Sequence, residues 1–356
     1  MVRFILSSVG SAVNLDRRCP HCRRNHGRIH SGLQGRRIVD LRTPVVLQRR
    51  MRCPDCGMTW TLRAEGVGAG RQRSDRIRGI GIVLYMLGLS YRSVATFLPC
   101  LDCTGSKSSI ERDVTEAGRR AAELHRSAPK ARVRVLGVDG TGDAMAGNKG
   151  GVLFFVDVDQ KRLLCVEPIQ ETDARRLRQH VRQVFAEVGA TELRTDEHSV
   201  YEGIVPPGRH RLCETHWRKS KGKRAWDLRK EARQTERDLE ADSMQTLLDL
   251  LRQKPRPPTP PPELGVLVRR YINARRGLPG RINRLLQHVE RTWEHVSDDP
   301  FDATNNATER TIGLDLKIRS KTMRGFKNKT KVLNHTYLSH LLRGGPTKQC
   351  DLRQIT

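Results

Sequence analysis

The order of apolar and polar residues predicts a buried strand in the middle of the chain. Residues Arg132–Gly140 read Arg-Val-Arg-Val-Leu-Gly-Val-Asp-Gly, and the valines suit a buried or half-buried strand. Asp139 ends this apolar run, and Gly140 then allows the chain to turn. A carboxylate at the tip of a central strand is well placed to bind a metal ion, because the sheet fixes its position. The alternative is an aspartate that only starts a surface turn.

Five further elements are expected after this strand, in the order strand, strand, helix, strand, strand: Gly151–Val158, Leu163–Ile169, Asp173–Val188, Thr191–Thr195 and Arg209–Cys213. The first two strands of this series form an antiparallel hairpin, since the link between them is short. The helix is amphipathic. Asp196 directly follows the next strand, so it lies beside Asp139 if those two strands are neighbours. The alternative for Asp196 is a turn or N-cap residue.

Residues 71–130 predict three helices separated by short turns: Ser74–Leu87, Tyr91–Leu98 and a third that runs from Ser108 to about His125. Ser90 is expected to cap the second helix, and the capping-box pattern Ser108-Ser-Ile-Glu111 to open the third. This outline is typical of a helix-turn-helix domain, whose last helix enters the major groove of DNA. The alternative is a helical bundle with a solvated charged face. The basic residues expected to contact DNA are Lys107, Arg112 and Arg119.

Two cysteine pairs near the N-terminus have the spacing of metal-binding knuckles. Cys19-Pro-His-Cys22 and Cys53-Pro-Asp-Cys56 are separated by the 30 residues from position 23 to position 52. Each pair supplies two thiolates, and two pairs complete a tetrahedral zinc site. Strand-like residues lie between the pairs, at Arg37–Val39 and Pro44–Arg52. Residues 1–70 therefore predict a zinc ribbon with one structural Zn²⁺ ion.

Other histidines and cysteines leave alternatives open. His21, His26 and His30 can replace a cysteine as ligands, although single histidines in a basic segment are more often solvated. A third C-x-x-C pair, Cys100 and Cys103, has no partner pair and is not expected to bind a metal. Nine cysteines in 356 residues, several in such pairs, indicate a reducing compartment and metal binding rather than disulfides.

The chain carries a large positive charge. It has 66 Lys and Arg against 39 Asp and Glu, a formal net charge of +27. This excess indicates a polyanionic partner. Nucleic acid fits better than a membrane, because the longest apolar run, Gly79–Leu89, is far shorter than the ~18 residues of a spanning helix. The start of the chain shows no secretory signal, so a cytoplasmic protein associated with the nucleoid is expected.

Residues 214–299 are expected to form a helical insertion, and residues 336–356 a C-terminal tail. The predicted helices of the insertion are His216–Glu240, Ser243–Gln253, Glu263–Arg275 and Leu278–His295. Six prolines in Lys254–Pro262 predict an extended spacer between the second and third helices. Trp217 and Trp226 either stack on an unpaired base or pack against other side chains.

Three motifs carry a resemblance to a known family. They are Gly137-Val-Asp139-Gly140; Thr195-Asp196 followed by Tyr201 and by Leu212-Cys213-Glu-Thr-His216-Trp217; and Thr304-Asn-Asn-Ala-Thr-Glu309-Arg310 followed by a basic run and Gly325-Phe-Lys-Asn328. With the Cys-x-x-His pattern after the second acid, residues 130–335 resemble the transposases of bacterial insertion sequences that use an Asp-Asp-Glu triad. The zinc ribbon and helix-turn-helix domain in front fit the same proteins.

The resemblance implies an RNase H-like α/β core, a mixed sheet with flanking helices, in residues 131–213 and 300–335. It implies that Asp139, Asp196 and Glu309 hold two Mg²⁺ or Mn²⁺ ions. The expected partner is double-stranded DNA, both element ends and target, bound by a homodimer or higher oligomer. The role of Cys213 and His216 stays open: two ligands make no complete metal site, and packing or DNA positioning is favoured. The basic residues near the third acid that are expected to hold phosphate are Arg310, Lys317, Arg319, Lys321, Arg324 and Lys327.

Glu309 has both a functional and a structural interpretation. Asn306-x-x-Glu309 is a capping box, so the glutamate can simply cap a helix. Ile312, Gly313 and Leu316 follow it with helical spacing, which places Glu309 on the buried side, and Gly313 is expected to permit close packing on the sheet. A glutamate on a buried side is unusual unless it is paired or metal-bound. The competing acids with weaker contexts are Glu294, Asp298, Asp299 and Asp302.

The sequence thus predicts a DNA transposase that cleaves and joins strands at the terminal inverted repeats of an insertion sequence. One alternative is an RNase H-fold nuclease that cuts without joining. A second is a zinc-ribbon transcription regulator with an inactive core. The triad separates these classes, because a regulator does not need three acids at these positions.

Overall fold

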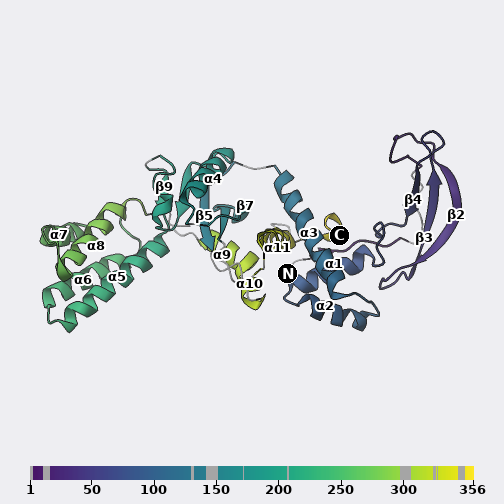
Figure 1. Ribbon diagram of the computed structural model, residues 1–356. Helices are drawn as coiled ribbons and strands as arrows, with labels where there is room; N and C mark the ends of the chain where they lie inside the picture. The colour runs from purple at the N-terminus through teal and green to yellow at the C-terminus, as the bar shows by residue number, and fades with distance from the viewer. Residues whose placement is uncertain are drawn as a thin grey trace. The chain divides into compact units, whose positions relative to one another are not determined.

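The computed structural model describes residues 3–10, 17–129, 132–141, 151–170, 172–206, 208–296, 306–323, 326, 328–343 and 349–356. The chain divides into two compact units, which we call the N-terminal unit (Met1–Ala128 with Ile318–Thr356) and the sheet unit (Pro129–Lys317) (Figure 1). This division differs from the predicted one, in which the catalytic core extended to residue 335. The reason is that α11 (Lys329–Leu342) packs on α3 (Lys107–Ser127).

A three-stranded antiparallel sheet follows the first cysteine pair. Its strands are β2 (Arg28–Arg37), β3 (Val45–Arg52) and β4 (Thr59–Arg63), with β3 in the centre. We call these strands and the two cysteine pairs the ribbon. The predicted strand Pro44–Arg52 is present as β3, whereas the predicted strand Arg37–Val39 is wrong, since β2 ends where it was expected to begin. The buried apolar cluster of this region is small: Ile38, Val46, Ala64 and Val67.

The three helices that follow lie where they were predicted, with ends that differ by one or two residues and with one different cap. They are α1 (Asp75–Met86), α2 (Tyr91–Phe97) and α3. The Ser74 and Ser90 side chains accept the N–H groups of Ile77 and Ser93, as N-caps do. The cap predicted for α3 at Ser108 is wrong, because the helix already begins at Lys107 and Ser106 accepts the N–H of Ser109.

The C-terminal segment, residues 336–356, is structured where it is described. Helix α11 continues to Leu342, and β10 (Gln349–Asp351) pairs in parallel with β1 (Arg3–Ile5) near the start of the chain. A short 3-10 helix, Leu352–Gln354, follows, with Leu352 fully buried. The prediction of a plain tail is therefore wrong, because this segment packs within the N-terminal unit.

A mixed five-stranded sheet forms the centre of the sheet unit. Its order is β7-β6-β5-β8-β9, with β6 antiparallel to both neighbours and with β5, β8 and β9 parallel. The strands are β5 (Val135–Thr141), β6 (Val152–Asp157), β7 (Arg162–Glu167), β8 (Glu192–Thr195) and β9 (His210–Leu212). Helix α4 (Ala174–Glu187) joins β7 to β8 and buries Leu177, Val181 and Val184. The prediction of a mixed α/β fold is confirmed, including the β6–β7 hairpin.

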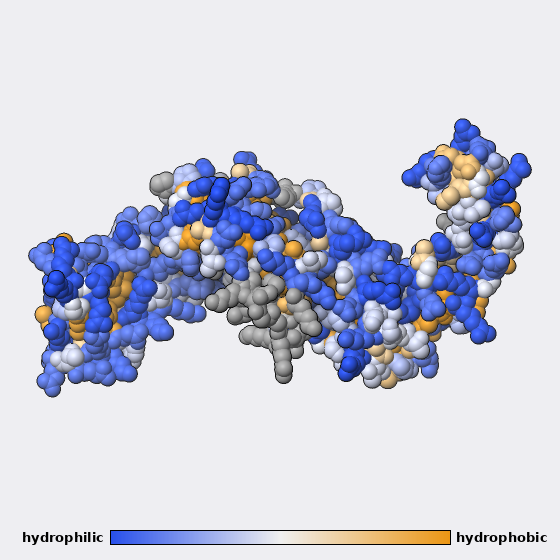
Figure 2. Space-filling view, in the orientation of Figure 1, coloured by the Kyte–Doolittle hydropathy of each residue, from blue (hydrophilic) through white to orange (hydrophobic). Residues whose placement is uncertain are grey.

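Four helices form a bundle after β9: α5 (Glu214–Gln234), α6 (Asp238–Arg252), α7 (Pro262–Tyr271) and α8 (Gly277–Trp293). Their leucines and two tryptophans make one buried cluster, and Figure 2 shows apolar side chains of this bundle in orange between hydrophilic outer faces. Trp217 is fully buried, donates to Thr292 Oγ1 at 2.9 Å and meets Trp293 edge to face, so it packs and does not stack on a base. Trp226 is half exposed and carries Arg229 over its ring.

Helix α9 (Asn306–Ile312) returns the chain from the bundle to the sheet. It packs on β5 and β6 and continues as a π-helical turn, Gly313–Lys317. Ile312 and Leu316 are fully buried, as their spacing predicted, but a side chain at Gly313 meets no atom within 4 Å, so this glycine is not needed for close packing. Within the described residues, no helix combines the length and the apolar character needed to cross a membrane.

Candidate metal centres and DNA-binding residues

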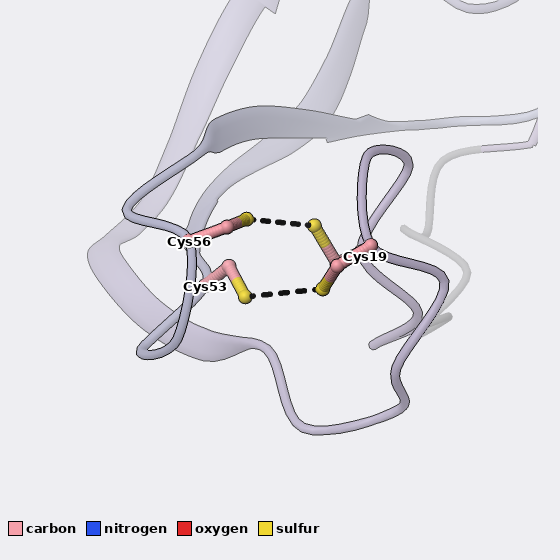
Figure 3. Close-up of side chains that lie close together, drawn as sticks. Cys19, Cys53 and Cys56 are labelled. Atoms are coloured by element: carbon pink, nitrogen blue, oxygen red, sulfur yellow. Dashed lines mark hydrogen bonds between the residues drawn. The ribbon is translucent and has the colours of Figure 1, made fainter.

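The four N-terminal cysteines come together, as the sequence predicted. The Sγ atoms of Cys19 and Cys56 are 3.6 Å apart, and those of Cys22 and Cys53 are also 3.6 Å apart. All four lie within 4.8 Å of one another, and Figure 3 shows sulfur atoms from the two pairs facing each other. Thiolates bound to zinc at ~2.3 Å in a tetrahedron are about 3.8 Å apart, so the arrangement fits one zinc ion.

The backbone favours the thiolates of Cys53 and Cys19. Hydrogen bonds from the N–H groups of Cys56 and Asp55 lower the pKa of the Cys53 thiol, although burial opposes them. Burial also raises the pKa of Cys19, but N–H groups of Cys22 and His21 outweigh it and lower that pKa to about 7. For Cys22 and Cys56, the N–H groups of Arg24 and Met58 are outweighed by burial and the neighbouring thiols, which raise the pKa of Cys22 and raise that of Cys56 to about 11. Turns that aim N–H groups at sulfur are suited to metal binding, because the thiolate is the form that binds metal.

Among the candidate histidine ligands, His26 is the one whose ring lies near the cysteine cluster. Its Nε2 is 3.5 Å from Cys53 Sγ and 3.3 Å from Asp55 Oδ2. Arg24 pairs with the same carboxylate at 2.5 Å. His26 therefore lies outside the four-sulfur set and can orient or shield Cys53.

Asp139 lies in β5, and Asp196 directly follows the adjacent parallel strand β8. In the register of β5 and β8, Gly137 is opposite Arg194, so Asp139 and Asp196 follow at the same level two residues later. The prediction that this strand ends at Asp139 is wrong. Strand β5 continues to pair with β6 through Thr141, and Asp139 lies opposite Phe154. Both aspartates are half-buried. The sheet thus brings the two predicted acids to one edge of its parallel part.

The Asp196 side chain also has the structural role that was its alternative. Its Oδ1 accepts the backbone N–H of His198 at 3.1 Å, which closes a tight turn after β8. Thr195 Oγ1 contacts the Asp196 carbonyl at 2.7 Å and His210 Nε2 at 2.9 Å. Burial, with the nearby His295, lowers the pKa of His210 to about 4. The loop that carries Asp196 is therefore held by the hydrogen bond to the His198 N–H and by the contact of Thr195 with His210.

Glu309 lies against His216 and Cys213. His216 Nε2 is 3.1 Å from Glu309 Oε1, and one ligand atom from each of the three residues lies within 4.8 Å of the others. Cys213 is the N-cap of α5 and His216 lies in its first turn, whereas Glu309 comes from α9. We call these three residues the Cys-His-Glu cluster. Among the described residues, it and the four cysteines are the two groups with at least three such ligands.

The electrostatics of this cluster keep His216 charged. The contact with Cys213 is the largest effect, and together with the negative charges of Cys213, Glu309 and Asp139 it raises the pKa of His216 to about 9 despite partial burial. A cationic imidazole beside Glu309 balances a carboxylate in the absence of metal. Asp139 has the smallest of these effects, and it does not belong to the group of three ligands.

The sequence predicted the Cys213–His216 pair and Glu309 as separate features and gave no indication that these residues lie in one cluster. The Cys-x-x-His spacing was visible, but its third member is far away in the chain. The sequence holds no local signal for that contact, because it depends on α9 returning to the sheet after the helical bundle. A role in packing alone does not account for a carboxylate held against the His216 ring.

The competing acids have other surroundings. Glu294 is exposed at the end of α8, where its carbonyl accepts from Arg211 at 2.6 Å. Asp157 is buried at the end of β6, accepts the Gln160 N–H at 3.1 Å and faces Arg162. Asp298, Asp299 and Asp302, as well as Asp143, lie outside the described residues. The described competitors are thus away from the two ligand clusters.

The predicted DNA-contacting residues fall into two groups. Lys107, Arg112, Arg119, Arg310 and Lys317 are exposed, although Arg119 pairs with Glu123 at 2.5 Å. Arg319 is 7% exposed, donates to the carbonyl groups of Gly88 and Leu89 and covers the Tyr85 ring, so its prediction as a phosphate contact is wrong. Its guanidinium is used to close the turn between α1 and α2. The side chains of Lys321, Arg324 and Lys327 lie outside the described residues.

No protein-family model and no curated protein matches the chain. Its function therefore has to be inferred from these residues and their geometry.

Proposed function

We propose that this chain is a DNA transposase of the Asp-Asp-Glu type, with an RNase H-like core that cleaves DNA at the ends of an insertion sequence and joins them to target DNA. The sheet order and strand directions support this fold assignment. Three antiparallel strands, a helix and two parallel strands build the order β7-β6-β5-β8-β9, which is the arrangement expected of an RNase H-like sheet.

One observation carries the proposal: three acids distant in sequence come from β5, from the residue after its neighbour β8, and from the helix that packs on β5, although among the described residues they do not form a group of ligand atoms within 4.8 Å of one another. Asp139 lies in β5, and Asp196 directly follows β8, the parallel neighbour of β5. Glu309 stands on a helix that packs on β5 and β6, and Asp139 and Glu309 both act on His216. The Oε1 atom of Glu309 is shielded from solvent and has no hydrogen-bond partner among the described residues. A buried carboxylate oxygen left without a donor is suited to a cation.

The chemistry follows from these carboxylates. Asp139, Asp196 and Glu309 would hold two Mg²⁺ ions, which supply activation of the attacking oxygen and stabilisation of the leaving oxygen. A water oxygen attacks the phosphorus at the element end, and the bond to the 3′-oxygen breaks, which releases a 3′-hydroxyl. That hydroxyl then attacks a target phosphodiester in line, so one phosphodiester forms as another breaks and no covalent protein–DNA link is required. The chain's residues orient the carboxylates: β5 and the turn after β8 hold two, and α9 holds the third.

The N-terminal unit supplies DNA binding in this proposal. The ribbon would hold one structural Zn²⁺ through Cys19, Cys22, Cys53 and Cys56. Residues 16–78 contain 16 Arg or Lys against 5 Asp or Glu, which favours phosphate contacts. Helix α3 exposes Lys107 and Arg112 at its N-terminal end, where a recognition helix meets bases. A homodimer or higher oligomer on double-stranded DNA, in the cytoplasm with the nucleoid, completes the proposal.

The test is Mg²⁺-dependent cleavage and strand transfer with a labelled duplex that carries the DNA flanking the gene. Asp139→Asn, Asp196→Asn and Glu309→Gln should each lower cleavage by about 10³-fold or more, and each as severely as the triple variant, because groups that act as a unit are not additive. Glu294→Gln is the matched control and should cleave like the parent. Asp139→Asn should bind the duplex as the parent does, with affinity that falls steeply with salt.

The alternatives give different results in the same assay. A nuclease cleaves the duplex but yields no joined product, and it loses activity with the same three variants. A transcription regulator binds the duplex, and neither the parent nor any variant cleaves it. Normal cleavage by Glu309→Gln together with an inactive Glu294→Gln would reassign the third ligand.

A further inference from the structure

We propose that the Cys-His-Glu cluster is a second metal site, one that takes a borderline divalent ion such as Zn²⁺ through the Cys213 thiolate, the His216 imidazole and the Glu309 carboxylate. The site is separate from the ribbon cysteines. Its existence does not depend on the proposed transposase activity.

The donor atoms have the spacing of a coordination sphere. His216 Nε2 and Glu309 Oε1 are 3.1 Å apart, and the Cys213 sulfur lies within 4.8 Å of the other ligand atoms. Zinc binds nitrogen and oxygen at about 2.0–2.2 Å and sulfur at about 2.3 Å, so tetrahedral ligands are about 3.4–3.8 Å apart. Small side-chain rotations are enough to reach these values.

Two polar atoms of the cluster lack the partners that burial requires. Glu309 Oε1 and His216 Nδ1 are both shielded from solvent, and neither has a hydrogen-bond partner among the described residues. Glu309 Oε1 faces His216 Nε2 at 3.1 Å, but the two groups are not aligned for a hydrogen bond. A buried oxygen left without a donor costs free energy. A metal ion between imidazole and carboxylate would satisfy the oxygen.

The ligands stand on well-held elements. Cys213 directly follows β9, and its N–H donates to the Thr195 carbonyl at 2.8 Å. His216 lies in the first turn of α5, where Trp217 is fully buried and fixes the helix. Glu309 lies between the buried Thr308 and Ile312 on the helix that packs on the sheet. Binding therefore requires little ordering of the chain, which favours affinity.

The ligand types select the ion. Thiolate and imidazole prefer zinc and similar transition metals, whereas Mg²⁺ prefers oxygen ligands. Three protein ligands leave a fourth position open, as in zinc sites that bind water or a substrate group.

The site shares Glu309 with the proposed triad, and this consequence rests on the proposed function. A zinc ion held by Cys213 and His216 would withdraw the Glu309 carboxylate from Mg²⁺. Zinc should then inhibit cleavage at concentrations that load the second site, and Mg²⁺ alone should not reverse it readily.

The direct test counts zinc on the full-length chain after equilibrium dialysis against a zinc buffer. The parent should hold two zinc ions per chain. His216→Gln and Glu309→Gln should hold one, with affinity for the second ion lower by about 100-fold or more, since even groups behind the ligands are worth ~10–100-fold. His180→Gln is the matched control: His180 also faces a glutamate, Glu167, at 3.5 Å but lies in neither ligand cluster, so this variant should hold two.

Folding failure and misassignment give distinguishable outcomes. The His216 and Glu309 side chains are 36% and 38% exposed, so their amides should leave the unfolding temperature of the metal-free chain unchanged. Cobalt added in place of zinc should give a second thiolate-to-metal absorption that Cys213→Ser removes. The proposal is overturned if the parent holds one zinc that Cys53→Ser abolishes, or if His216→Gln keeps both ions. These counts do not involve DNA cleavage, so they stand whether or not the chain is a transposase.

Discussion

The ribbon and the five-stranded sheet position candidate metal ligands in opposite ways. The buried apolar cluster beside the ribbon strands has four residues, Met51 of β3 is buried as well, and the four ligands of the ribbon come from two short turns. The sheet unit buries seventeen residues in the cluster that includes β5, β6 and α4, and its candidate ligands come from separate strands and helices. Zinc at the ribbon would replace a missing core, whereas metal at the sheet would bind to a fold that already exists.

This difference indicates what stabilises each region, metal binding in the ribbon and apolar burial in the sheet unit. A small sheet with so few buried apolar residues cannot offset the ordering of its strands, so binding of zinc and folding are one event there. In the sheet unit, apolar burial holds the ligands in place before any ion arrives. The following predictions test this contrast, beginning with the largest expected effect.

Loss of zinc should unfold the ribbon and leave the sheet intact. Cys53→Ser removes one ligand from a site whose binding contributes about 10–16 kcal/mol in zinc-finger peptides. Hydrogen exchange followed by mass spectrometry should show β2, β3 and β4 exchanging fully, while β5 and β6 stay protected. Cys165→Ser is the control, since this half-buried cysteine lies in neither ligand cluster. A protected β3 in the zinc-free protein would contradict the contrast.

A cavity in the sheet should have the converse effect. Phe155 is fully buried on the central part of β6, and Phe155→Ala should cost the sheet unit about 3–5 kcal/mol of unfolding free energy. Denaturant unfolding with segment-resolved exchange measures this loss, and the zinc content of the ribbon should not change. Val266→Ala on α7, where the side chain is 48% exposed, should cost little. Release of ribbon zinc by Phe155→Ala would mean that the two regions are not independent.

Acid should weaken the sheet unit through His210. Burial lowers its pKa from 6.5 to about 4, so between these values the unfolded chain binds a proton that the folded chain does not. Its contribution is complete above pH 6.5 and is lost as the pH falls toward 4, on the order of 3 kcal/mol. His210→Gln should flatten this fall, measured as exchange of β8 and β9 against pH. Equal pH dependence in parent and variant would exclude His210 as the cause.

The smallest effect concerns the helices beside the ribbon, which should be stable without metal. Ser106→Ala removes the oxygen that accepts the Ser109 N–H, and it should lower unfolding free energy by about 1 kcal/mol. Ser108→Ala is the matched control and should be nearly neutral, since Ser108 is exposed within the first turn. Thermal unfolding of the zinc-loaded chain measures both. A larger loss for Ser108→Ala would restore the capping box predicted from the sequence.

Local patterns were enough to predict most elements and one complete ligand set. The apolar runs that became β6 and β7, the cap Ser90 and the doubled Cys-Pro-x-Cys each depend on residues close together in the chain. The cysteine cluster could be predicted because two short turns bring all its ligands together, whereas the pairing of β5 with β8 was a condition that only the structure met.

Contacts between distant segments could not be predicted in this way. Strand β5 extends to Thr141 because it pairs with β6. Arg319 is buried because its guanidinium donates to the carbonyl groups of Gly88 and Leu89. The contact of Glu309 with Cys213 and His216 joins residues that are separated in sequence by the whole helical bundle, α5 to α8. Periodicity indicates which face of a helix is buried, but it does not indicate which side chains of other elements pack against that face.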